Sequence, residues 1–90
     1  MYQLIIVDDE VTIAEGVANL FPWQEIGFEA KAFCDPIEAM EYIQNHPVDV
    51  VMSDIEMPQI NGLELARQVS KKGTKVVIIE SDLFDYPNLF

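Results

Sequence analysis

The stretch VVMSDIEMPQING, residues 50–62, decides the fold of this chain. It begins with an apolar run that ends at a single carboxylate, Asp54, and a proline-containing turn and an Asn-Gly pair follow. Such a run is typical of a strand buried on both faces of a parallel sheet. Asp54 would then lie at the carboxyl end of that strand, where open α/β sheets bind ligands. A carboxylate there can be a nucleophile, a metal ligand or both, or it can merely start a turn or cap the next helix.

The composition restricts the class of protein. The 90 residues correspond to one small domain or to part of one, and 16 acidic residues against 5 basic ones give a net charge of −11. A surface this negative disfavours direct contact with nucleic acid or an anionic membrane, because the phosphates repel it. Cys34 is the only cysteine, so no internal disulfide is possible, and no apolar run is long enough to span a bilayer. Because no signal peptide opens the sequence, we expect a cytoplasmic protein without a membrane partner.

Hydrophobic periodicity predicts strands and helices that alternate along the chain. Strands are expected at residues 3–7, 28–33, 48–53 and 76–79, and helices at 11–20, 36–45 and 62–72. Asp35 and Pro36 should start the second helix as its N-cap and first helical residue, and His46 should belong to the turn that ends it. The alternation predicts an α/β domain with a parallel sheet.

Each helix should turn an apolar face toward the sheet. We expect these faces to contain Val11, Ala14, Val17 and Phe21 in the first helix, Ile37, Met40 and Ile43 in the second, and Leu63, Ala66 and Val69 in the third. Phe21 and Trp23, in the connector after the first helix, should close the core at that corner rather than bind a ligand. Residues 28–33 alternate apolar side chains with Glu29 and Lys31, which is typical of a half-exposed edge strand.

Acidic side chains follow two of the predicted strands. Asp8, Asp9 and Glu10 come directly after the first strand, and Asp54 ends the third. In the flavodoxin-like order 2-1-3-4-5 these strands are neighbours, so Asp8, Asp9 and Asp54 should converge, and Mg²⁺ would relieve their mutual repulsion. A cation beside a carboxylate suits phosphoryl transfer, with Asp54 as the attacking group. The acids after the first strand can alternatively serve only as an acidic turn that complements a helix dipole.

Two motifs make the chain similar to the receiver domain of two-component response regulators. Residues 7–10, VDDE, resemble the family's acidic pair after the first strand, and residues 54–62 resemble its D-x-x-M-P-x-x-x-G motif. Together they are highly specific, and the resemblance covers residues 1 to about 80. Residues 21–28, FPWQEIGF, further resemble a corner of regulators that carry an AraC-type DNA-binding domain. The resemblance implies a single, truncated receiver domain over residues 1–90, with a flavodoxin-like sheet of order 2-1-3-4 that lacks the family's fifth strand and fifth helix.

The resemblance also implies roles for individual residues. Asp54 would accept a phosphoryl group from a sensor histidine kinase, Asp9 would bind Mg²⁺ directly, and Asp8 would help through water. The main-chain carbonyl of Glu56 would be the third protein ligand of the cation. The family's switch hydroxyl, at the end of the fourth strand, falls on Ser81, with Glu80 as the alternative position.

The end of the sequence departs from the family pattern. No basic residue follows Lys75, so we expect the family's phosphoryl-binding lysine, fifth strand and fifth helix to be missing. Phosphorylation should then be weak or absent, since a charge-assisted partner for the phosphoryl oxygen is lost. The open fourth strand, together with the apolar tail 83–90, should form a homodimer or a domain-swapped oligomer with a second copy.

Two alternative functions are compatible with these residues. The first is a receiver-like interaction module that dimerises, or binds a kinase or another regulator, without being phosphorylated. The second is an enzyme, because Asp8-x-Glu10-x-Thr12 faintly resembles the D-x-D-x-T nucleophile motif of haloacid dehalogenases. Its second acid is Glu, and the chain offers no later lysine or second acidic loop of that family, so we expect no enzymatic activity.

Overall fold

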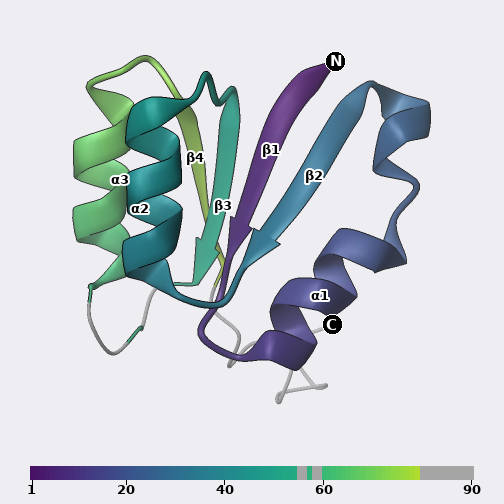
Figure 1. The fold of residues 1–90 in the computed structure, drawn as a ribbon, viewed down its shortest axis with the longest axis horizontal. Coiled ribbons are helices and arrows are strands. Elements are labelled where there is room, and N and C mark those ends of the chain that lie inside the picture. The colour runs from purple at the N-terminus through teal and green to yellow at the C-terminus, as the bar shows by residue number, and fades with distance from the viewer. Residues whose placement is uncertain (55–56, 58–59, 80–90) are drawn as a thin grey trace, which may run out of the picture.

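A computed structural model describes residues 1–54, 57 and 60–79. The elements found there are β1 (Tyr2–Val7), α1 (Val11–Leu20), the 3-10 helix η1 (Trp23–Ile26), β2 (Phe28–Phe33), α2 (Pro36–Asn45), β3 (Val50–Asp54), α3 (Gly62–Ser70) and β4 (Lys75–Ile79) (Figure 1). All strand pairs are parallel, in the order β2-β1-β3-β4. This is the predicted flavodoxin-like fold with order 2-1-3-4. None of the helices described is long and apolar enough to cross a membrane.

The register of the sheet brings the carboxyl ends of its strands to one edge. Val7, the last residue of β1, pairs with Phe33 of β2 and with Ser53 of β3 (lower edge of the sheet in Figure 1). At the opposite edge the Asp49 amide donates to the Gln3 carbonyl at 3.0 Å, and the Asp49 Oδ2 accepts from the Gln3 amide at 2.7 Å. The β1–β3 pair is therefore held at both ends, which fixes the position of side chains that follow either strand.

Side chains on both faces of the sheet are buried, as expected for parallel strands. The core cluster on one face joins strand residues to α2 and α3, which lie side by side (Figure 1), and contains Ile5, Val7, Ala39, Met40, Ile43, Val51, Leu65 and Val69. Successive strand residues point to opposite faces, so Leu4 and Ile6 are buried on the other face. There α1 contacts β1 and β2, and Ala14 is its buried residue.

Side-chain caps fix where α2 and α3 begin. The Asp35 Oδ1 accepts a hydrogen bond of 2.9 Å from the amide two residues ahead, with Pro36 in the first turn. This confirms the predicted start of the second helix. The Asn61 Oδ1 accepts from the Leu63 amide at 2.7 Å, so Asn61 caps the third helix and Asp54 does not. Of the two structural roles that the sequence kept open for Asp54, the helix cap is therefore excluded, and the start of a turn falls on residues outside the described part of the chain.

The ends of the elements agree with the prediction to within about two residues, the usual uncertainty of helix and strand ends. α2 ends at Asn45, and the His46 Nδ1 lies 2.9 Å from the Tyr42 carbonyl oxygen while the two rings stack at 3.9 Å. His46 therefore has the helix-terminating role that was predicted. The third strand begins at Val50 rather than 48, and the third helix ends at Ser70 rather than 72.

The predicted helix faces were partly wrong. Val11 and Ile37 are each 50% exposed and Leu63 is 57% exposed, whereas Leu65 is fully buried. The prediction took the rotational phase of each helix from apolar spacing alone. In the structure, Leu65 and Val69 of α3, four residues apart on one face of the helix, turn toward the sheet.

The corner between α1 and β2 is closed by one aromatic residue rather than two. The Trp23 Nε1 donates to the Val17 carbonyl at 3.0 Å, and the Trp23 ring packs edge-on against Phe28 with centroids 6.2 Å apart. Phe21 contacts Trp23 at 5.4 Å but stays 52% exposed. Trp23 therefore has the predicted packing role, while Phe21 remains largely at the surface.

Candidate functional site

Three carboxylates meet where β1 and β3 end. Asp8 follows β1 directly, Asp54 is the last residue of β3, and Asp9 comes next after Asp8. Each of the three offers an oxygen atom, and these atoms all lie within 4.8 Å of one another. The convergence predicted from the strand order is therefore present in the structure.

Backbone contacts fix the position of the two buried acids. The Asp8 amide donates to the Phe33 carbonyl of β2 at 3.1 Å, and the Asp8 Oδ1 accepts from the Glu10 amide at 2.9 Å. On β3, the Ser53 hydroxyl is fully buried and donates to the Asp54 carbonyl at 3.0 Å. The sequence analysis did not predict this contact of Ser53. The available signal was a hydroxyl side chain inside an apolar strand, directly before Asp54.

The three acids differ in their exposure to water. Asp8 and Asp54 are buried, with 6% and 7% of their surface exposed, whereas Asp9 is exposed. Burial and the charges of Asp54, Asp9 and Glu10 raise the pKa of the Asp8 carboxyl from 3.8 to about 6, although the hydrogen bond from the Glu10 amide lowers it. Asp8 therefore pays a desolvation cost when it is ionised near neutral pH, and a nearby cation would offset that cost.

The donor set fits Mg²⁺. It consists of oxygen atoms only, it carries several negative charges, and it is open on the side of Asp9, so that water can complete an octahedral shell. Asp8, Asp9 and Asp54 are the residues that would hold the ion. Of the other predicted site residues, Glu56, Glu80 and Ser81 lie outside the described residues.

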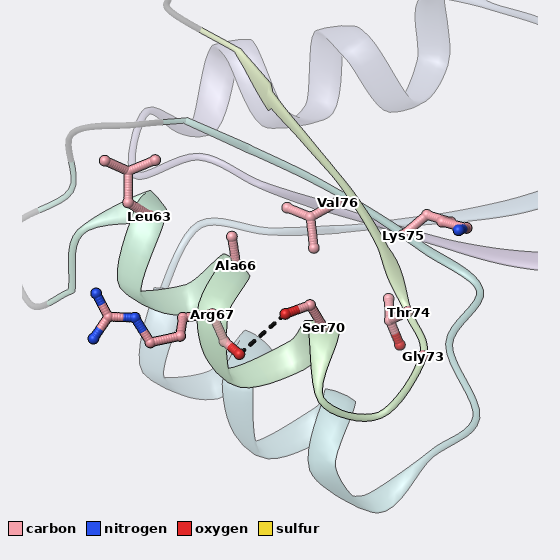
Figure 2. A pocket seen from close by; sticks show the side chains of 8 residues that line it. All are labelled: Leu63, Ala66, Arg67, Ser70, Gly73, Thr74, Lys75 and Val76. Carbon is pink, nitrogen blue, oxygen red and sulfur yellow. Dashed lines mark hydrogen bonds between the residues drawn. The ribbon is translucent and has the colours of Figure 1, made fainter.

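A second concavity, between α3 and β4, has a different character. An open groove of about 480 Å³ lies there, and its apolar lining includes Leu63, Ala66 and Val76, whose side chains are drawn in Figure 2. Its polar lining includes Arg67 and Ser70, whose hydroxyl donates to the Arg67 carbonyl at 3.1 Å. None of the three converging carboxylates lines this groove, so it is not part of the candidate cation site.

Comparison with known proteins identifies the family. The profile of the response regulator receiver domain matches residues 4–82, which include both acidic motifs. The chain belongs to the response regulator receiver family. Receiver domains bind Mg²⁺ at an acidic pocket, and this receiver domain has an acidic cluster where β1 and β3 end.

Relatives of this receiver domain include transcriptional regulators. The transcriptional regulatory protein HptR of Staphylococcus aureus is 35% identical over 88 residues, which is 96% of this chain and 35% of HptR. The chain thus spans about a third of the length of the curated relatives it matches. A two-component transcriptional regulator AraC from Clostridium phytofermentans matches 100% of this chain and 74% of the solved chain, with a TM-score of 0.80 and 25% identity.

A third relative was solved both with Mg²⁺ and BeF and with a histidine kinase. TrrA of Thermotoga maritima, in complex with Mg²⁺ and BeF, is 34% identical, with coverage of 98% of this chain and 76% of TrrA and a TM-score of 0.73. TrrA in complex with the histidine kinase ThkA matches with a TM-score of 0.77 over 90% of this chain and 70% of TrrA. Receiver domains of this family thus act as partners of histidine kinases.

Proposed function

We propose that this receiver domain is phosphorylated on Asp54 by a sensor histidine kinase in the presence of Mg²⁺. The observation that carries the proposal is the convergence of Asp8, Asp9 and Asp54 within 4.8 Å at the carboxyl edge of the sheet. Asp54 sits at the end of a buried strand that β1 flanks on one side and β4 on the other. Its main chain is thus held in the sheet, and Asn61 rather than Asp54 caps the following helix.

The chemistry follows from the positions of the three acids. An Asp54 oxygen attacks the phosphorus of a phosphohistidine, the P–N bond breaks as the new P–O bond forms, and the histidine nitrogen leaves with the electron pair. Asp9, which is exposed, would bind Mg²⁺ directly, and Asp8 would act through a metal-bound water. The Glu56 carbonyl would be the third protein ligand. When bound, Mg²⁺ screens the incoming phosphoryl group from these acids and stabilises charge on its oxygens.

The partners and the biological setting are part of the same proposal. A sensor histidine kinase supplies the phosphoryl group, as the TrrA–ThkA complex supports, and the response alters transcription, as the relationship to HptR and the AraC-type regulator supports. The domain acts in the cytoplasm, makes no direct contact with nucleic acid or membrane, and turns over no metabolite as an enzyme of its own. Either Ser81 or Glu80 is the residue at the switch position.

Intact-mass measurement tests phosphorylation directly. The protein is incubated with acetyl phosphate and Mg²⁺, and we expect a mass gain of one phosphoryl group in the wild type and none in Asp54→Asn. Asp35→Asn is the matched control, because Asp35 also follows a strand at this edge and Asn is an equally good N-cap. The control should gain the same mass as the wild type.

Two results would contradict the proposal. One is a mass gain that survives in Asp54→Asn, which would place the phosphoryl group elsewhere. The other is no gain in the wild type although calorimetry shows Mg²⁺ binding, which would favour the phosphorylation-independent interaction module. Assembly through the fourth strand and the tail 83–90 also stays a prediction, since residues 80–90 lie outside the described part of the chain.

A further inference from the structure

The strand β2 forms an outer edge of the sheet with outward-facing backbone groups. β2 is the outermost strand on the side opposite β4 and pairs only with β1 among the described strands (Figure 1). The Gly27 carbonyl accepts a hydrogen bond from the Tyr2 amide of β1 at 2.9 Å, and the Phe33 carbonyl accepts one from the Asp8 amide at 3.1 Å. Because these alternate residues face β1, the amides and carbonyls of residues 28, 30 and 32 point outward. Within the described ranges, no hydrogen bond involves these outward groups.

The outward edge is complementary to itself. If two copies of β2 pair antiparallel with Ala30 opposite Ala30, residue 28 of each lies opposite residue 32 of the other, and these are the hydrogen-bonded positions. Glu29 of each copy then lies opposite Lys31 of the other, at non-hydrogen-bonded positions where opposing side chains are closest. Both side chains are exposed. Moving the axis by one residue would instead place Lys31 opposite Lys31, or Glu29 opposite Glu29.

An exposed aromatic groove lies beside the same axis. A concavity of about 420 Å³ is lined by residues of the α1–η1 corner and by Ala30, and Phe21 and Trp23 belong to its lining. Phe21 is 52% exposed, and Trp23 is half-buried. Since Ala30 lies on the axis, the two grooves come close to each other when the strands pair. The lining of the groove is more polar than apolar, so the pairing depends on the backbone hydrogen bonds and on charge rather than on buried apolar surface.

The charges also favour a second copy of the chain as the partner of β2, paired in this register. Each chain has a net charge of −11, so two copies repel one another unless opposite charges meet at the contact. The β2 edge offers a matched Glu29–Lys31 pair twice over. β4 offers no such match, because an antiparallel pair centred on Val77 would place its one charged residue, Lys75, opposite Ile79.

We propose that two copies of this receiver domain associate through antiparallel pairing of their β2 strands, centred on Ala30, with reciprocal Glu29–Lys31 contacts. The pairing joins two four-stranded sheets into one continuous sheet. It leaves the acidic edge of each copy accessible, because Glu29 and Lys31 lie within β2 and the converging acids lie at the carboxyl ends of β1 and β3. The association therefore does not depend on phosphorylation of Asp54.

Charge exchange at the two positions tests the pairing. Sedimentation equilibrium is measured for the wild type, Glu29→Lys, Lys31→Glu and the double exchange, which has the wild-type net charge. Each single variant places like charges opposite one another twice, so its dimer should dissociate about tenfold more readily. The double variant should recover wild-type affinity to within about threefold. Circular dichroism checks that all four proteins remain folded.

Two further variants separate the local contact from the overall charge. Glu41→Lys and Lys71→Glu make the same changes in net charge at exposed positions outside β2, and they should leave the dimer affinity near that of the wild type. The proposal is overturned if the wild type stays monomeric up to about 1 mM, a concentration at which even weak pairing is populated. It is equally overturned if the double exchange fails to restore the dimer affinity that the single exchanges lose, or if all variants dimerise with the same affinity.

Discussion

At the scale of single residues, Asp8 carries the strongest electrostatic signal of the acidic site. Its folded-state pKa of about 6 lies above the value of 3.8 for a free carboxyl, mainly because of burial. The folded chain therefore binds a proton more tightly at Asp8 than the unfolded chain does. The resulting stability is fully present below about pH 3.8 and is lost as the pH rises through about 6.

Replacing Asp8 should reveal the free-energy cost of burying its ionised carboxylate. In the absence of Mg²⁺ and at neutral pH, we expect Asp8→Asn to be more stable than the wild type by up to about 3 kcal/mol, because no buried charge has to be desolvated. The Asn oxygen can still accept from the Glu10 amide. The gain should shrink as the pH falls from about 7 to about 4, where the wild-type carboxyl is protonated. Urea unfolding across this range measures the difference.

The same pair of proteins reports on the cation. Mg²⁺ should raise the unfolding free energy of the wild type at neutral pH and have a much smaller effect on Asp8→Asn, since ligand binding stabilises only the state that holds the ligand. A difference between the two proteins that stays constant with pH would refute the assignment of the raised pKa to Asp8.

At the scale of elements, the caps decide where the helices begin. The Asp35 Oδ1 accepts a hydrogen bond of 2.9 Å from the Ile37 amide in the first turn of α2. Asp35→Ala should therefore lower the unfolding free energy by about 1 kcal/mol. Asp35→Asn should be nearly neutral, because the amide oxygen can accept the same hydrogen bond. Equal losses in both variants, measured by urea unfolding, would show that the carboxylate charge matters rather than the cap.

The rotational phase of α3 gives a second element-scale prediction. Leu65 is fully buried and Leu63 is 57% exposed, although they lie two residues apart on one helix. Leu65→Ala should cost about 2–5 kcal/mol through lost contacts and the resulting cavity, whereas Leu63→Ala should cost less than about 1 kcal/mol. Thermal unfolding of the two variants measures this difference. A larger loss of stability in Leu63→Ala than in Leu65→Ala would contradict the observed orientation of α3.

Much at this scale was readable from the sequence. Strand alternation and the two acidic motifs predicted the sheet order and the meeting of Asp8, Asp9 and Asp54, because the carboxyl ends of parallel strands share an edge. The phase of α3 was not readable, because its apolar residues fit more than one rotational phase: Leu63, Ala66 and Val69 share one spacing, and Leu65 and Val69 share another. The unequal burial of Asp8 and Asp9 was also hidden, because neighbouring acids look alike in a sequence, whereas in the structure Asp8 bonds to the Phe33 carbonyl and the Glu10 amide.

At the scale of the whole molecule, charge is separated between the two edges of the sheet. The three acids gather at the carboxyl edge, whereas Lys71, Lys72 and Lys75 lie before β4 or at its start, toward the opposite edge. The Lys72 ammonium donates to the Ile43 carbonyl at 2.6 Å and so also ties the end of α3 to α2. This polarity leaves the acidic edge without a nearby described lysine, so a divalent cation is the natural source of positive charge there.

The most direct test of the account is to locate the phosphoryl group. After reaction with acetyl phosphate, borohydride reduces an aspartyl phosphate to homoserine, which peptide mass spectrometry can assign to a position. The account predicts homoserine at residue 54 alone, and only when Mg²⁺ is present during phosphorylation. Homoserine at Asp8 or Asp9, or equal conversion of Asp54 in the presence of a chelator, would contradict it.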